Sequence, residues 1–87
     1  MKVMLVDDHA VVRAGYRRLL ELEPGCEVVA EHASAEAALN ALARTDGRGV
    51  DVLVLDLSMP GRGGLDLLRR ASLRWPALPV LVFSMHD

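Results

Sequence analysis

The sequence predicts an α/β fold in which helices pack on the faces of a parallel sheet. Apolar runs typical of strands alternate with segments of helical periodicity in the order β-α-β-α-β-α-β, and the connections are only a few residues long. Such alternation favours a parallel sheet with right-handed crossovers. The stretch 50–61 contains the unbroken apolar run 52–55, which is typical of a strand buried on both faces. Asp56 follows this run directly, and the rest of the chain is organised around the stretch 50–61.

The first half of the chain predicts two strands and two helices. Residues 3–6 are apolar and end at Asp7, which indicates a strand. Apolar residues then recur at helical spacing until Pro24 and Gly25 end the helix. Residues 27–31 have a short apolar centre between charged residues, as an edge strand has. Ser34 is the expected N-cap of a second helix, which contains Ala35, Ala38, Leu39 and Leu42.

The second half continues the alternation. Residues 46–49 form a turn, and the third strand follows until Pro60 and Gly61 stop it. A third helix is expected because Leu68, Ala71 and Trp75 recur at helical spacing, and Pro76 ends it. Asp66 lies in its first turn, where an acidic side chain is favourable. Residues 78–84 are the expected fourth strand.

Composition indicates one domain, covering residues 1–87. The net charge is −2, and acidic and basic residues are interspersed, which argues against a nucleic-acid-binding face. No apolar run approaches the ~20 residues that span a membrane. The single cysteine, Cys26, excludes an internal disulfide, and no secretion signal is evident. A reducing cytoplasm is therefore the expected location.

Acidic residues follow the strands at the edge where ligands collect in parallel sheets. Asp7 and Asp8 follow the first strand, Asp56 ends the third, and Ser84 ends the fourth. Clustered carboxylates repel one another, so such a cluster predicts a cation. Oxygen ligands favour Mg²⁺ or Mn²⁺, which commonly bridge to phosphate. Asp56 is then the candidate nucleophile for an acyl phosphate, and Ser84 a candidate donor to its oxygens.

Each of these residues also has a simpler interpretation. Asp8 could be an N-cap of the first helix, Asp7 a solvated strand end and Asp56 a turn residue. Ser84 alone could bond to backbone. Their coincidence at successive strand ends favours the shared site.

Other polar residues are expected outside the site. The three histidines, His9, His32 and His86, lack metal-ligand spacing, and His32 is expected at the surface. Arg13 and Arg17 are expected on a solvated helix face or in a partner surface. Gly61, Gly63 and Gly64 are interpreted as turn and helix-entry residues and not as a nucleotide loop.

The chain resembles the receiver domain of two-component response regulators, more narrowly the NarL/FixJ-like class. The resemblance rests on residues 6–9 (Val-Asp-Asp-His), 13–15, 19–21, 56–60 (Asp-Leu-Ser-Met-Pro), 64 and 79–87. It implies a flavodoxin-like (CheY-like) doubly wound sheet with strand order 2-1-3-4. It also implies that a histidine kinase or a small phosphodonor phosphorylates Asp56, with Mg²⁺ bound.

The resemblance assigns individual roles. Asp8 would bind the metal directly, Asp7 mainly through water, and Ser58 through its backbone carbonyl, beside Asp56. Ser84 would follow the phosphoryl group and switch the adjoining surface. Ser58 and His86 would tune the lifetime of the acyl phosphate. Such a module accepts the phosphoryl group on itself and is not an enzyme in the sense of turnover.

The sequence also departs from the resembled family. It ends after the fourth strand, so the fifth strand with its lysine and the last two helices are missing; Lys2 is its only lysine. A fragment of a longer protein is therefore expected, and the helix-turn-helix domain of the NarL-like class would lie outside it. DNA binding is expected of the full-length parent and not of this piece. The exposed fourth strand and an open sheet face predict self-association.

Two other classes of function remain open from the residues. A Mg²⁺-dependent phosphohydrolase can also use a strand-end aspartate, but it typically has a second acid where this chain has Ser58. An interaction or dimerisation module with an inactive site is the other alternative.

Overall fold

The computed structural model describes residues 1–59, 61 and 63–83. The elements occur in the predicted order: β1 (Lys2–Val6), α1 (Ala10–Glu21), β2 (Glu27–His32), α2 (Ala35–Thr45), β3 (Val52–Asp56), α3 (Gly63–Arg74) and β4 (Val80–Phe83). All seven elements therefore match the periodicities of the sequence, with boundaries that shift by one to three residues.

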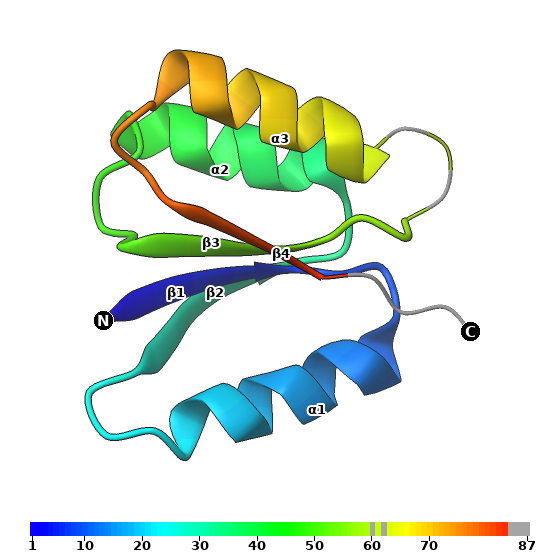
Figure 1. Ribbon diagram of the computed structural model, residues 1–87, viewed down its shortest axis with the longest axis vertical. Coiled ribbons are helices and arrows are strands. Elements are labelled where there is room, and N and C mark those ends of the chain that lie inside the picture. Colours follow the sequence, from blue (N-terminus) through cyan, green and yellow to red (C-terminus); the bar gives the residue numbers. More distant parts are fainter. Residues whose placement is uncertain (60, 62, 84–87) are drawn as a thin grey trace.

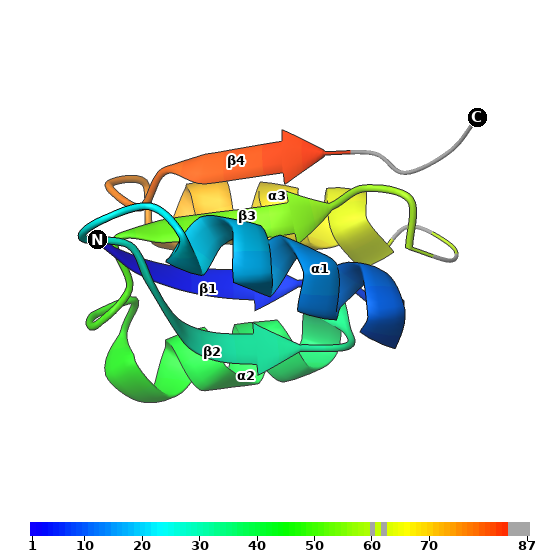
Figure 2. The same ribbon diagram turned by 90° about the horizontal axis from the view of Figure 1, so that it is seen from below.

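The four strands form one parallel sheet in the order β2-β1-β3-β4, which confirms the predicted topology. Helices α2 and α3 lie together on one face of the sheet, and α1 lies alone on the other (Figure 1). Figure 2 shows the sheet from the side of α1, with β2 along one edge and β4 along the other. The prediction that β2 is an edge strand is confirmed. Strand β3, which ends at Asp56, lies inside the sheet between β1 and β4.

The two faces of the sheet differ in how well they are buried. The larger core lies between the sheet and the α2–α3 layer and includes Leu42, Leu53, Leu55 and Leu67, all fully buried. The smaller core lies on the α1 side and includes Val3, Leu5, Val28 and Val54. Helix α1 itself contributes no fully buried residue. The α1 face is therefore the more weakly covered one.

Helix ends follow the expected chemistry, with one addition. The Ser34 hydroxyl accepts a hydrogen bond from Ala37 N at 3.2 Å, so the predicted N-cap is confirmed. Helix α3 ends at Arg74, just before the expected stop. Trp75 continues the turn and donates its indole Nε1–H to Asp46 Oδ1 at 3.0 Å, which ties the ends of α2 and α3 together.

Candidate metal centre

Asp7 follows β1 directly and is fully buried. Its backbone N–H donates to His32 O at 3.1 Å, which extends the pairing of β1 with β2. Its Oδ1 accepts a hydrogen bond from His9 N at 2.8 Å, whereas its Oδ2 is buried without a hydrogen-bond partner. The interpretation of Asp7 as a solvated strand end is therefore wrong. β1 lies between β2 and β3 in the sheet, so the neighbouring strands exclude solvent from its carboxyl end.

Asp56 is the last residue of β3 and is also fully buried. Its Oδ1 accepts hydrogen bonds from the backbone N–H of Ser58 at 2.7 Å and from the Ser58 hydroxyl at 2.6 Å. Its Oδ2 has no hydrogen-bond partner. Asp56 thus stabilises the turn that follows β3 with one oxygen, as the simpler interpretation expects. The other oxygen remains available.

Asp8 lies in the loop between β1 and α1, with about a quarter of its side chain exposed. The N-cap of α1 is His9, and no side chain caps the helix in the residues described. The interpretation of Asp8 as an N-cap is therefore wrong. Asp8 Oδ1 is buried and accepts no hydrogen bond.

These side chains converge at one point. Asp7, Asp8, His9 and Asp56 each offer a ligand atom, and the four atoms all lie within 4.8 Å of one another. Burial raises the pKa of Asp7, and the nearby carboxylate of Asp56 raises it further, against the lowering effect of the hydrogen bond from His9 N. Asp7 Oδ2 and Asp56 Oδ2 are buried without a hydrogen-bond partner, and the close neighbour of Asp8 Oδ1 is His9 Nδ1 at 3.0 Å, so the negative charge of the cluster is incompletely balanced. A hard divalent cation fits this donor set.

Sequence reasoning missed two residues at this site. His9 was expected to lack metal-ligand spacing, yet the loop folds its imidazole Nδ1 to 3.0 Å from Asp8 Oδ1. Arg13 was expected on a solvated face or in a partner surface. Its Nη1 instead donates to the Asp7 carbonyl at 2.6 Å, and its Nε pairs with Glu31 at 3.2 Å. The signal available in the sequence was the spacing from Asp7 to Arg13, which places the arginine one turn into α1, within reach of the end of β1.

His32 also differs from expectation. It ends β2 and is partly buried, with an Nε2 atom that is enclosed and has no hydrogen-bond partner. Burial lowers the pKa of His32, and the positive charge of Arg44 lowers it further. His32 is therefore half-buried at the end of an edge strand and not fully exposed at the surface.

The loop after β3 is held close to α3 by a glycine. A Cβ atom on Gly64 would lie 2.7 Å from the backbone oxygen of Asp56 and 2.9 Å from Leu57 Cα. Met59 anchors the same loop in the larger core. The prediction that Gly64 is a helix-entry residue is confirmed, and its missing side chain lets α3 approach the acidic strand end. Two predicted site residues, Ser84 and His86, lie outside the described part of the chain.

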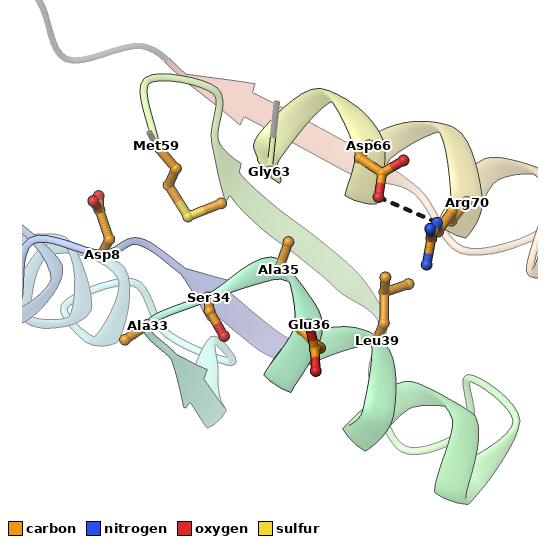
Figure 3. Close-up of a pocket in the computed structure, with 10 residues that line it drawn as sticks. All are labelled: Asp8, Ala33, Ser34, Ala35, Glu36, Leu39, Met59, Gly63, Asp66 and Arg70. Atoms are coloured by element: carbon orange, nitrogen blue, oxygen red, sulfur yellow. Dashed lines mark ion pairs between the residues drawn. The ribbon is translucent and has the colours of Figure 1, made fainter. Parts of the chain in front are cut away.

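A groove of about 370 Å³ opens beside the cluster, between the starts of α2 and α3 (Figure 3). Asp8 and Met59 border it on the side of the cluster, and Asp66, paired with Arg70 at 3.2 Å, lies on the side of α3. The groove therefore borders the acidic cluster through Asp8, whereas the buried Asp7 and Asp56 do not line it.

A doubly wound parallel sheet with acidic residues at the ends of its two central strands defines the CheY-like class of α/β domains. The chain belongs to the response regulator receiver domain family, which matches residues 3–87. The predicted membership is thereby confirmed. Among the described residues, no helix is long and apolar enough to cross a membrane.

The chain is similar in sequence to response regulators of the NarL/FixJ-like class. It is 45% identical to the transcriptional regulatory protein UhpA of Salmonella typhimurium over 98% of this chain and 40% of UhpA. It is 41% identical to the nitrate/nitrite response regulator protein NarP of Escherichia coli over 99% of this chain and 39% of NarP. The chain thus spans about two fifths of the length of these relatives.

Solved structures show the same fold. A LuxR-family two-component response regulator from Aurantimonas sp. superposes with a TM-score of 0.86 at 43% identity, over 99% of this chain and 59% of that one. RcsB of Salmonella enterica serovar Typhimurium, bound to the promoter rprA with the phosphomimetic BeF₃⁻, superposes with a TM-score of 0.86 at 33% identity. That match covers all of this chain and 44% of RcsB.

Proposed function

We propose that this chain is the phosphoacceptor module of a two-component pathway and that Asp56 receives the phosphoryl group. The observation that carries the proposal is the buried, unpartnered Oδ2 of Asp56 within the cluster formed with Asp7 and Asp8. One oxygen of Asp56 is fixed by Ser58, so the other is oriented for attack. The histidine kinase and small phosphodonors are the proposed sources of the group.

The transfer step is a displacement at phosphorus. Asp56 Oδ2 forms the new O–P bond while the bond from phosphorus to the donor breaks. In a phosphohistidine donor that bond is N–P, its electron pair stays on the imidazole nitrogen, and the nitrogen takes a proton from solvent. The product is an acyl phosphate on Asp56 and a neutral histidine on the kinase.

Asp7, Asp8, Asp56 and the backbone carbonyl of Ser58 are the proposed ligands of a Mg²⁺ or Mn²⁺ ion. When bound, the ion neutralises charge on the phosphoryl oxygens and on the acidic cluster. The unpartnered oxygens of the three aspartates support this role. The further roles proposed from the resemblance are contact and switching by Ser84 and lifetime tuning by Ser58 and His86.

The proposed output is transcription regulation by a DNA-binding domain outside this chain, in the cytoplasm. Its support is the similarity to transcriptional regulators and to RcsB, which was solved bound to a promoter. The chain itself would bind no DNA, and it would not turn over a substrate. A phosphohydrolase is disfavoured because Ser58, which occupies the position of the second acid, has no carboxyl group and its hydroxyl is bonded to Asp56.

Phosphorylation can be tested by intact mass. We expect incubation with a small phosphodonor and Mg²⁺ to add the mass of one phosphoryl group to the protein at its natural length. Asp56→Asn should abolish the gain, since the amide is not a nucleophile, and EDTA should suppress it. Asp51→Asn is the matched control, because Asp51 directly precedes β3, at the end away from Asp56, and accepts a hydrogen bond from Lys2 N. A protein that gains no phosphoryl group, or an Asp56→Asn variant that still does, would contradict the proposal.

We also propose self-association of this chain through β4 or through the open sheet face beside α1. Leu81 is 58% exposed and Val82 is 40% exposed, and β4 pairs only with β3 among the described residues. An apolar strand with one unpaired edge favours pairing with a second chain.

Substitution of one leucine tests this association. Leu81→Lys should weaken dimerisation in sedimentation equilibrium about tenfold or more, since burying a leucine is worth ~1.5–3 kcal/mol. Leu73→Lys is the control, because Leu73 is 85% exposed on α3. A wild-type chain that remains monomeric at high concentration, or an equal effect of both substitutions, would refute association through β4.

A further inference from the structure

We infer that His9 supplies a nitrogen ligand to the metal site and makes it prefer transition-metal ions to Mg²⁺. The inference rests on the proposed function, because it concerns the same acidic cluster. The inference adds to the proposed function a residue, His9, that determines which ion is bound.

The distances fit a shared ion. His9 Nδ1 lies 3.0 Å from Asp8 Oδ1 and 3.6 Å from Asp7 Oδ1. Two adjacent ligands of an octahedral ion with bonds of about 2.1 Å are separated by about 3.0 Å. The separation between His9 Nδ1 and Asp8 Oδ1 therefore equals that of two neighbouring ligands.

The unpartnered atoms point to a ligand between these side chains. Asp7 Oδ2 and Asp56 Oδ2 have no hydrogen-bond partner, and the close neighbour of Asp8 Oδ1 is His9 Nδ1 at 3.0 Å. Both Asp7 and Asp56 are fully buried. Asp7, Asp8, His9 and Asp56 each offer one ligand atom, and these four atoms lie within 4.8 Å of one another.

The backbone fixes His9 while leaving its ring free to adjust. His9 N donates to Asp7 Oδ1 at 2.8 Å, and His9 O accepts from Arg13 N at 2.8 Å in the first turn of α1. The side chain is 59% exposed, so a small rotation towards the ion would disrupt no packing. The position is fixed by the main chain, and the ring can complete the coordination.

A nitrogen ligand changes the order of affinities. Mg²⁺ favours oxygen ligands, whereas imidazole suits Mn²⁺, Co²⁺ and Ni²⁺ progressively better. Aspartates alone would hold all these ions with less discrimination. With His9 present, we expect Ni²⁺ and Co²⁺ to bind more tightly than Mg²⁺ by a margin that depends on this residue.

Titration calorimetry with each metal alone tests the inference. His9→Gln should weaken Ni²⁺ and Co²⁺ binding about tenfold, the factor that corresponds to about 1.4 kcal/mol, and leave Mg²⁺ binding nearly unchanged. His32→Gln is the control, because His32 is absent from the cluster. Pulsed electron paramagnetic resonance of bound Mn²⁺ should show coupling to an imidazole nitrogen that His9→Gln removes.

The outcomes separate the inference from the proposed function. Equal weakening of Mg²⁺ and Ni²⁺ by His9→Gln would overturn it and make His9 a positioning residue for Asp8. No weakening, or nitrogen coupling that survives in the variant, would also overturn it. If the wild type binds none of these ions, the proposed metal site itself fails. If Asp8→Asn abolishes Mg²⁺ binding and His9→Gln leaves it unchanged, the proposed Mg²⁺ site is supported, whatever the result with Ni²⁺.

Discussion

Asp7→Asn is expected to stabilise the metal-free protein at neutral pH, raising the free energy of unfolding by about 1–3 kcal/mol, the usual range for a buried polar group without a partner. Asp7 is fully buried beside Asp56, and its Oδ2 has no hydrogen-bond partner. An asparagine keeps the oxygen that accepts from His9 N and removes the charge. Urea unfolding in EDTA measures the difference between variant and wild type.

The pH dependence gives this prediction a direction. The folded-state pKa of Asp7 is raised above its ordinary value of 3.8, first by burial and then by the carboxylate of Asp56. The folded state therefore binds its proton more tightly than the unfolded state does, and stability falls as pH rises through 3.8 to the folded-state pKa. The advantage of Asp7→Asn should be present at neutral pH and vanish below 3.8.

Divalent metal supplies the complementary measurement. Mg²⁺ should raise the melting temperature of the wild type, because an ion that binds only the folded state stabilises it by about 2.7 kcal/mol at a hundredfold excess over Kd. Asp7→Asn should lose most of that gain. Identical unfolding curves for variant and wild type at neutral pH in EDTA would show that the buried carboxylate carries no penalty.

Gly64→Ala is expected to destabilise the fold by about 1–3 kcal/mol, the usual cost of overpacking, and to disturb the acidic site as well. The new Cβ would lie 2.7 Å from the Asp56 backbone oxygen and 2.9 Å from Leu57 Cα. Both are backbone atoms, so a side-chain rotation cannot relieve the contact. The start of α3 or the loop after β3 must shift, and Asp56 moves with it.

The same substitution elsewhere provides the control. Gly15 lies within α1, and an added Cβ would meet no atom within 4 Å. Gly15→Ala should therefore stabilise the protein by up to about 1 kcal/mol, because alanine is the better helix former. Chemical unfolding of both variants, with phosphorylation followed by mass, checks the pair. A Gly64→Ala variant as stable as Gly15→Ala would exclude the tight contact between α3 and the end of β3.

Much of the site was predictable because parallel strands have a polarity. Asp7 and Asp56 end neighbouring strands, so the alternation of strands and helices alone places them at one edge of the sheet. The register confirms this, since Val6 pairs with Leu55. The apolar run that ends at Asp56 also predicted a buried strand, because only a strand covered on both faces has no polar residue.

Periodicity and strand polarity thus suffice to predict the order of elements, the parallel sheet and the shared edge for Asp7, Asp8 and Asp56. Three features follow only from the packing of the elements: Asp7 is buried, His9 and not Asp8 is the N-cap of α1, and Arg13 donates to the Asp7 carbonyl. The physical reason is that periodicity reports which face of an element is apolar. The direction of a loop side chain depends on contacts between elements far apart in the chain.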